Sequence, residues 1–431
     1  MNAIARRSLY LCFIGTIASA AVPIERISVN AAGVQGNRLS EPGSIADGGN
    51  IVAFTSGAFN LVPGDFDDGF DFSYAMIRNR QGNSTNWVVQ PAVRTRSIGY
   101  PVLSRDAAFV VFYSQQANLV PGDTSSPDYF RKNLVSGEVV RVNQPPAGGN
   151  SNGQVDEYAR VTADGRFVAF ASPGSDLVAG DTNGVSDIFV RDMNSNVIER
   201  VSVGSNGEQA LGNSTYPWIS GDGRFVAFAS LGTQLGMAPG VALNVFVRDR
   251  VSNTTSRVSV GVGGVDPNGT SGFGPFKATI SDDGRWVSFG SIASNLVAGD
   301  TNGRADIFLT DRTSGTTTRV STGLNGEQLT LSTDQSAMSG DGSRIIYSIQ
   351  VGLTGNPLIL FDRPSGLRIP LNRSPDGTVN GRAIFPSISA DGQFVAVRAD
   401  DAIVQQVSDG NDDVFLFDLR TVMQIFKDGF E

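Results

Sequence analysis

One short phrase recurs along the chain at a nearly constant spacing, and this repetition constrains the fold more than any other feature. The phrase is a turn of Ser or Thr, a variable residue, Asp and Gly, followed by an alternating apolar run. Successive turn aspartates lie 50 to 61 residues apart, at Asp47, Asp106, Asp164, Asp222, Asp283, Asp341 and Asp391. A period of this size is typical of a propeller or a solenoid.

Each repeat contains four β-like segments. In the third repeat they cover residues 159–162, 167–171, 187–192 and 198–203, and Asp164-Gly165 is a hairpin turn between the first two. Four short strands joined by turns make one antiparallel meander. Seven such units predict an all-β fold, a β-propeller with seven four-stranded blades, although six blades remain an alternative.

The N-terminal part of the repeat region contains a candidate closing strand. Residues 24–29 copy the fourth-strand phrase of residues 199–203, and they precede the first repeat. We expect this segment to pair with the last blade, within residues 388–418, and to close the ring. An open solenoid is the alternative, but it would need capping repeats. The expected organisation is a single propeller domain over residues 21–420.

Two phrases carry a resemblance to a known family. Residues 219–228 and 187–192 resemble the repeats of TolB-type β-propellers, in which a Ser-Pro-Asp-Gly turn precedes an apolar strand. The resemblance covers residues 24–418 and implies a propeller used as a periplasmic interaction platform; related propellers form parts of peptidases and lyases. Propellers of this family often have six blades. The first repeat departs most, with an extra residue between Asp47 and the strand at 51–54.

Composition removes several kinds of chemistry. The 431 residues include no histidine, and the only cysteine is Cys12. Histidine-based triads, histidine metal ligands, disulfides and thiolate sites are therefore excluded from a chain that has lost its first twenty residues. The formal charge of −9 makes a nucleic-acid backbone an unsuitable partner.

The first twenty residues are predicted to be a secretory signal peptide. Arg6 and Arg7 form the positive region, residues 8–16 are mostly apolar, and Ala18-Ser19-Ala20 is a small-residue cleavage site. A transmembrane anchor is the alternative, but the apolar stretch is too short. We expect a monomer exported to the periplasm or the exterior, with no integral membrane segment after cleavage. Residues 421–431 are expected to form a C-terminal tail.

The loops between the second and third strands are acidic in three repeats. Acids and amides surround a turn there, at Asp65, Asp67, Asp71, Asp181, Asn183, Asp187, Asp300, Asn302 and Asp306. Such oxygen ligands suit calcium, which is the one possible cofactor indicated by the sequence. The alternative, which we favour, is local: Asp and Asn side chains cap nearby backbone amides in Asx-turns.

A second set of candidates lies shortly before the Ser or Thr of the turn. The aromatic residues Tyr100, Tyr158, Tyr216, Phe276 and Phe385 fall four or five residues ahead of it, and Arg160 and Trp218 are close by. The first strand of a blade is innermost, so these side chains are expected near the mouth of the central channel, where aromatics could bind a glycan or a peptide. Packing between blades is the alternative, and burial of large rings favours it.

These features support three functional hypotheses. The leading one is an exported, non-catalytic binding platform for a protein or glycan ligand, with no catalytic residue assigned. The alternatives are a calcium-dependent propeller enzyme of the polysaccharide lyase or glycoside hydrolase type, and a calcium-stabilised structural envelope protein. The outer-strand arginines, exemplified by Arg141 and Arg200, are predicted to form a solvated edge.

Overall fold

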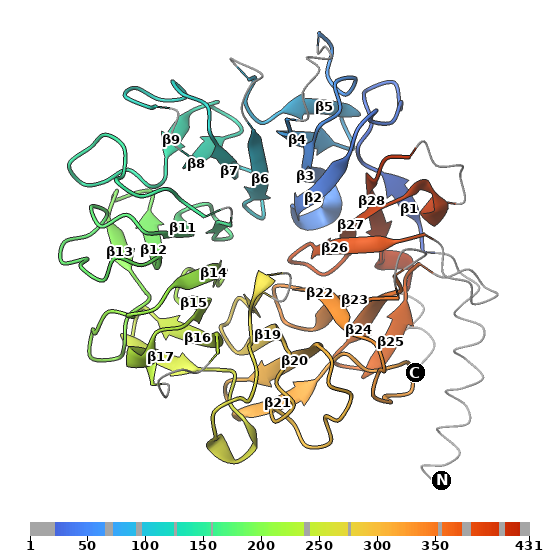
Figure 1. Ribbon diagram of the computed structural model, residues 1–431. Helices are drawn as coiled ribbons and strands as arrows, with labels where there is room; N and C mark the ends of the chain where they lie inside the picture. Colours follow the sequence, from blue (N-terminus) through green and yellow to red (C-terminus); the bar gives the residue numbers. More distant parts are fainter. Residues whose placement is uncertain are drawn as a thin grey trace.

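Seven small antiparallel sheets stand in a ring around a central axis (Figure 1). The computed structural model describes residues 22–64, 72–91, 97–124, 127–156, 158–236, 242–274, 277–351, 356–372, 381–404 and 410–422. Within these ranges there are 28 strands, four to a sheet, and six of the seven sheets follow chain order from the axis outwards. The fold is therefore a seven-bladed β-propeller, which confirms the predicted class and blade number.

The strands of blades 1 to 4, from the inner to the outer, are β2 (Ser40–Ile45), β3 (Ile51–Ser56), β4 (Tyr74–Asn79), β5 (Ser84–Trp87); β6 (Ile98–Leu103), β7 (Phe109–Ser114), β8 (Asp128–Asn133), β9 (Val139–Arg141); β10 (Arg160–Val161), β11 (Phe167–Ser172), β12 (Asp187–Asp192), β13 (Ile198–Arg200); β14 (Ser214–Ile219), β15 (Phe225–Ser230), β16 (Asn244–Asp249) and β17 (Thr254–Arg257). Those of blades 5 to 7 are β18 (Thr279–Ile280), β19 (Trp286–Ser291), β20 (Asp306–Asp311), β21 (Thr316–Arg319); β22 (Thr333–Met338), β23 (Arg344–Ile349), β24 (Leu358–Asp362), β25 (Leu367–Pro370); β26 (Ala383–Ile388), β27 (Phe394–Ala399), β28 (Asp413–Asp418) and β1 (Ile24–Arg26). Short 3-10 turns occupy Asp47–Gly49, Thr233–Leu235, Val262–Gly264 and Asp401–Val404.

The ring is closed by strands from both ends of the propeller. β1 pairs antiparallel with β28, placing Ile24 opposite Phe417 and Arg26 opposite Phe415. β1 is thus the outermost strand of the blade whose other three strands come from the end of the chain. The predicted closure by an N-terminal strand is confirmed.

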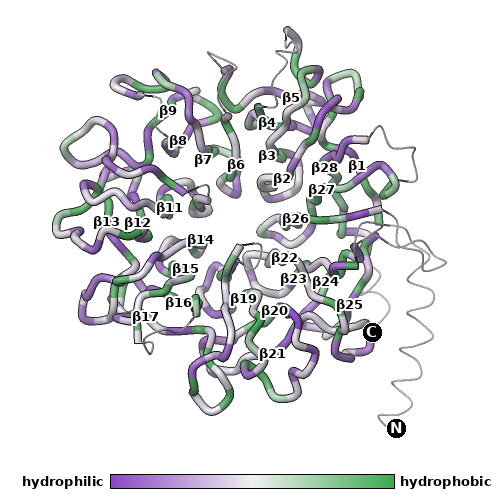
Figure 2. The backbone as a smooth tube through the Cα atoms, viewed as in Figure 1, coloured by the Kyte–Doolittle hydropathy of each residue, from purple (hydrophilic) through white to green (hydrophobic). Residues whose placement is uncertain are grey.

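The core lies within and between the blades rather than in one central mass. Aromatic pairs from the second and third strands stack inside a blade, as in Phe170 with Phe189 and Phe228 with Phe246, with ring centroids 5.8 and 6.0 Å apart. All four rings are fully buried, and each contributes about 1.5–3 kcal/mol by leaving water. Figure 2 shows hydrophobic stretches along the strands and many hydrophilic ones in peripheral loops. Neighbouring blades bury both faces of each sheet.

The repeated turn is a structural lock within each blade. In blade 4 the Ser220 hydroxyl donates to Asp222 (2.6 Å) and accepts from the Phe225 backbone N–H (2.9 Å). Gly223 has a φ of +78°, and a Cβ there would lie 2.5 Å from the Phe167 ring of blade 3. Glycine is required for both reasons, the left-handed backbone and the close approach.

The same turns also join neighbouring blades. Arg250 of blade 4 lies 4.5 Å above the Phe167 ring of blade 3 and donates a hydrogen bond to the Gly223 carbonyl. Arg312 does the same one blade further, 4.9 Å from the Phe225 ring and bonded to the Gly284 carbonyl. The recurring phrase therefore reflects blade construction and carries no information about a ligand.

The first repeat is shifted by one residue from the alignment expected from sequence. The Ala46 N–H donates to the Ile51 carbonyl, just as the Ser104 N–H donates to Phe109 in blade 2. Ala46 thus takes the Ser position, Asp47 the variable position and Gly48 the Asp position. This correction makes the first interval 58 residues, like the two that follow.

Candidate binding site at the ring axis

The innermost strands bring one residue from each blade to the same level of the axis. This position lies four residues before the Ser or Thr of the turn, and we call the set the tyrosine layer. Its members are Pro42, Tyr100, Tyr158, Tyr216, Lys277, Gln335 and Phe385. The ring centroids of Tyr100 and Tyr158 are 5.8 Å apart and those of Tyr158 and Tyr216 are 5.5 Å apart. The Lys277 ammonium lies 3.2 Å from the Tyr158 centroid. Three consecutive blades thus form a continuous aromatic arc, and the cation from the fourth lies over its middle ring.

Three aromatic residues of this layer have a strained backbone. Tyr100, Tyr216 and Phe385 have φ values of +52°, +55° and +53°, and a proline follows each directly. The inner strands β6, β14 and β26 change register at these points. A bulky residue in this region costs on the order of 1–3 kcal/mol, which glycine would avoid. The same strain occurs in three blades, so the orientation of the side chain matters there.

Burial between blades does not fully account for these rings. Tyr100 is 36% exposed and Phe385 is 44% exposed, although both belong to innermost strands. Tyr158 and Tyr216 are partly buried. The sequence left two roles open for these aromatics, packing and ligand binding. The rings of the layer pack on one another and still present aromatic surface to solvent, so the structure is compatible with both roles.

A second layer lies two residues further along each inner strand, and we call it the arginine layer. Its members are Ser44, Val102, Arg160, Trp218, Thr279, Ala337 and Ser387. The Arg160 guanidinium lies 4.2 Å from the Trp218 ring and donates a hydrogen bond to the Ala159 carbonyl. Burial lowers the pKa of Arg160 to about 10, although the nearby Tyr129 and Tyr158 act in the opposite direction. The group remains a cation at neutral pH.

The far end of the axis carries the variable residues of the seven turns, which we call the turn layer. Backbone N–H groups donate from each blade to the carbonyl of the next, in the runs Asp47 to Arg105 to Ala163 to Gly221 and Asp282 to Gly340 to Ala390. At one gap between the runs the Asp391 N–H donates to the Asp47 carboxylate instead. The seven blades are thus tied together around the axis at this level.

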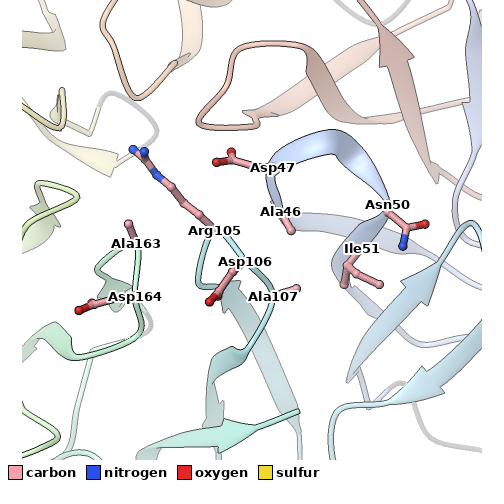
Figure 3. Close-up of a pocket in the computed structure, with 9 residues that line it drawn as sticks. All are labelled: Ala46, Asp47, Asn50, Ile51, Arg105, Asp106, Ala107, Ala163 and Asp164. Carbon is pink, nitrogen blue, oxygen red and sulfur yellow. The ribbon is translucent and has the colours of Figure 1, made fainter. Parts of the chain in front are cut away.

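An ion pair crosses the turn layer. Arg105 of blade 2 reaches Asp282 of blade 5, and Figure 3 shows its side chain extending from the turn between Asp47 and Ala163. Burial raises the pKa of Asp282, and the hydrogen bond from Arg105 opposes that rise. A cavity of about 620 Å³ lies beside this pair, with Asp106 also in its lining. The pair spans the axis on this face, so the tyrosine layer lies toward the opposite face.

The acidic loop of blade 3 is organised around an arginine. The Arg200 guanidinium lies 2.9 Å from the Asp181 carboxylate and 3.5 Å from that of Asp187. Asn183 and Ser202 also donate to Asp187, at 2.7 and 2.5 Å. Burial raises the pKa of Asp187 even so. The carboxylates converge on a guanidinium, in the place where a bound cation would be expected.

Blade 5 repeats this arrangement. Arg319 lies 3.3 Å from Asp300 and 3.9 Å from Asp306, and Asn302 donates to Asp306 at 3.0 Å. The Asn302 oxygen accepts the Arg304 backbone N–H, which is the local capping expected of an Asx-turn. Self-capping and arginine pairing therefore occur together in the two described loops.

Calcium binding by these loops stays a prediction. Asp65, Asp67 and Asp71 lie outside the described residues. In the part of the chain that is described, no three acidic, cysteine or histidine side chains form a group suited to a metal ion. A calcium ion at Asp181 or Asp300 would have to compete with the arginine already there.

The prediction of a solvated arginine edge was wrong. The Arg141 side chain is only 2% exposed and donates to Asp123, and the equivalent arginines form ion pairs in the same way. Those equivalents are Arg26, Arg200, Arg257 and Arg319. They hold loops to strands rather than blunting an edge.

The sequence did not predict three members of the tyrosine layer. Phe276 was selected in blade 5, five residues before the turn, whereas Lys277 occupies the equivalent position. Nothing was assigned to Gln335, or to Pro42, whose turn has Ala46 in place of Ser. Phe276 itself lies outside the described residues, as do the expected signal peptide and residues 423–431 of the tail. A strict spacing of four residues before the Ser would have identified Lys277 and Gln335.

Comparisons with known proteins show the fold and no closer relationship. No protein-family model matches the chain, and no curated protein matches its sequence. Solved structures that resemble it include a TolB from Acinetobacter baumannii, with 16% identity and a TM-score of 0.40, covering 69% of this chain and 58% of TolB. An oligogalacturonate lyase in complex with manganese has 11% identity and a TM-score of 0.58, covering 94% of this chain and 98% of the lyase. The β-propeller domain of the Trilobed protease from Pyrococcus furiosus has 9% identity and a TM-score of 0.53, covering 89% and 94%.

These neighbours have different activities, so the shared fold does not select among them. The match spans less than two thirds of the TolB chain. Within the described residues, no helix has the length and apolar character needed to cross a bilayer.

Proposed function

We propose that this chain is an exported binding propeller, and that its ligand, a glycan or a protein segment, docks at the tyrosine layer. The observation that carries the proposal is the aromatic arc of Tyr100, Tyr158 and Tyr216 with its strained backbone. Strain that is kept at equivalent positions of several blades needs a compensating use, and binding is the most direct one.

The surroundings of the arc suit binding. Hydrogen-bonded blades and a cross-axis ion pair fix the inner strands, so the rings are held in place before a ligand arrives, which lowers the entropic cost of association. Tyr100 and Phe385 provide exposed aromatic surface on the two blades that flank blade 1. Aromatic side chains of this kind dominate the energetics of recognition sites.

A catalytic role has weaker support. The two layers facing the axis contain no carboxylate, so the paired acids of a glycoside hydrolase are missing from these positions. Likeness to an oligogalacturonate lyase concerns the fold and does not assign its chemistry to this chain. Export rests on the N-terminal sequence, and either the periplasm or the exterior would suit a binding protein.

The test uses glycine substitutions, each of which removes an aromatic ring and at the same time relieves the backbone strain at that residue. Residues 21–431 are applied to glycan and peptide arrays, and the best ligand is then titrated by calorimetry. Tyr100→Gly and Tyr216→Gly should weaken binding at least tenfold each, while the melting temperature stays equal or rises, because glycine accepts positive φ without strain.

The matched control is Val135→Ala, since this side chain is 90% exposed on blade 2 and belongs to neither layer. It should leave affinity unchanged. Arrays without any ligand for the parent chain, or full affinity in both glycine variants, would overturn the proposal.

A further inference from the structure

Arg160 is half-buried, and it differs from the buried Arg191 of its blade in how few of its donors are used. Within the described chain it donates one hydrogen bond, to the carbonyl of the preceding residue Ala159, and no carboxylate pairs with it. A guanidinium has five N–H donors in a fixed planar fork. Most of that fork is therefore available, at a place where burial already disfavours the charge.

Arg191, two strands further on in the same sheet, shows how the fold supplies acceptors to an arginine without an acid. Its fork donates to the Val142 and Gln144 carbonyls and to the Asn196 side chain. The part of a guanidinium fork that has no protein partner can donate to the oxygens of a ligand. The fold supplies three acceptors to Arg191 and one to the half-buried Arg160.

The charge around Arg160 has one sign. Among the fourteen residues of the tyrosine and arginine layers, only Arg160 and Lys277 are charged, and both are positive. Both lie against aromatic rings, Arg160 on Trp218 and Lys277 on Tyr158. The chain as a whole has a formal charge of −9, so this positive axis stands out from an acidic molecule. Local charge of this kind attracts anions.

We propose that the axial site recognises a carboxylate, which binds the free edge of the Arg160 guanidinium, and that the ligand is an acidic saccharide. This deepens the proposed function and rests on it. A planar fork matches the two oxygens of a carboxylate. The exposed rings of Tyr100 and Phe385 give the flat apolar face of a sugar a surface to cover. A small free carboxylate shares the charge chemistry but would not use these rings.

The experiment is calorimetric titration of residues 21–431 with tri-galacturonate, its methyl ester and sodium acetate. The free acid should bind at least tenfold more tightly than the ester and than acetate. Arg160→Gln should abolish the preference for the acid, and Arg160→Lys should keep part of it, because the charge remains and the fork is lost. Arg304→Gln is the matched control, since Arg304 is exposed on a loop of blade 5 and carries the same charge; it should preserve the preference.

Stability separates this role from a structural one. Arg160→Met keeps an apolar contact with Trp218 and removes an unpaired charge, so its melting temperature should equal or exceed that of the parent chain while the acid preference disappears. A clear loss of stability would assign Arg160 to the scaffold and overturn the inference. So would equal affinity for acid and ester, or no binding of tri-galacturonate. If acetate binds as tightly as the trimer, the site recognises a carboxylate but the ligand is not specifically a saccharide. If Tyr216→Gly still weakens an array ligand in these cases, the proposed function stands and only the anion inference fails.

Discussion

Blade 3 contains two arginines with opposite surroundings. Arg200 on the outer strand is flanked by Asp181 and Asp187 and also donates to the Gln209 side chain, at 3.0 Å. Arg160 on the inner strand donates only to a neighbouring carbonyl. The two guanidiniums carry the same charge, but Arg200 has two carboxylates beside it and Arg160 has none among the described residues. An arginine with carboxylates beside it serves the fold, whereas an arginine with few protein partners is available to a ligand.

The two regions also differ in how faithfully they repeat. The pairing of an outer arginine with an aspartate recurs in five blades, through Arg26, Arg141, Arg200, Arg257 and Arg319. The tyrosine layer instead changes from blade to blade, with Pro42, Gln335 and Lys277 interrupting the aromatics. Repetition builds a rigid ring, and the departures from it at the axis are the positions at which the proposed site would gain its specificity.

The largest expected effect comes from breaking the compensated arginine. Arg200→Met leaves two buried carboxylates without their counter-charge, which should lower the free energy of unfolding by about 3–5 kcal/mol at neutral pH. Urea denaturation followed by tryptophan fluorescence measures it. Arg304→Met, at an exposed position, should change it by less than about 0.5 kcal/mol.

The loss should also depend on pH. Burial raises the pKa of Asp181 and of Asp187, and removal of Arg200 takes away a group that opposes this rise. A raised folded pKa means that the folded state holds its proton more tightly, so stability recovers as pH falls. The penalty of Arg200→Met should therefore be smaller at pH 5 than at pH 8. An equal penalty at both, or none at either, would show that the outer cluster is not the compensated site described above.

Calcium provides a second test, with a smaller expected effect, of whether Arg200 neutralises the carboxylates beside it. With the Arg200 guanidinium between its carboxylates, the parent chain should melt at the same temperature in calcium and in chelator. In Arg200→Met the vacated carboxylates should gain affinity for the ion. A dissociation constant of roughly 1 mM with 10 mM calcium would return about 1.4 kcal/mol.

The control for calcium is magnesium at the same concentration, which prefers stricter octahedral geometry and should stabilise the variant less. A rise of several degrees in the parent chain would instead mean that calcium binds native loops, and it would restore the metal interpretation of Asp181 and Asp300.

Sequence predicts the fold here far better than the site. The Ser-x-Asp-Gly turn is a local device in which Ser220, Asp222 and Gly223 each have a fixed backbone role, so the copies after the first are placed correctly from the sequence. The outer arginines were misjudged because their pairing depends on loops that approach only in three dimensions. Arg160 and Tyr158 were identified as axial by spacing alone. Whether Arg160 is compensated depends on surrounding acceptors, which no spacing reveals.

The smallest expected effect compares the two ends of β12. Asp187 at one end is buried, while Asp192 at the other pairs with Arg166 at 2.8 Å near the surface. The hydrogen bond from Arg166 lowers the pKa of Asp192 well below its usual range. A depressed folded pKa contributes stability above the unfolded value of about 3.9, and this stability is lost as pH falls through and below it. Because the pair is exposed, the contribution is small.

Asp192→Asn should therefore lower the urea midpoint slightly at pH 6, and the difference from the parent chain should shrink as the pH falls below about 3.9. The control is Glu138→Gln, an exposed carboxyl with no ion pair among the described residues, which should track the parent chain throughout. Parallel curves for Asp192→Asn and the parent at every pH would mean that Arg166 does not hold this carboxylate in solution. In that case the contrast with Arg160 would rest on the buried pairs, such as Arg200 with Asp187, and not on surface pairs such as Arg166 with Asp192.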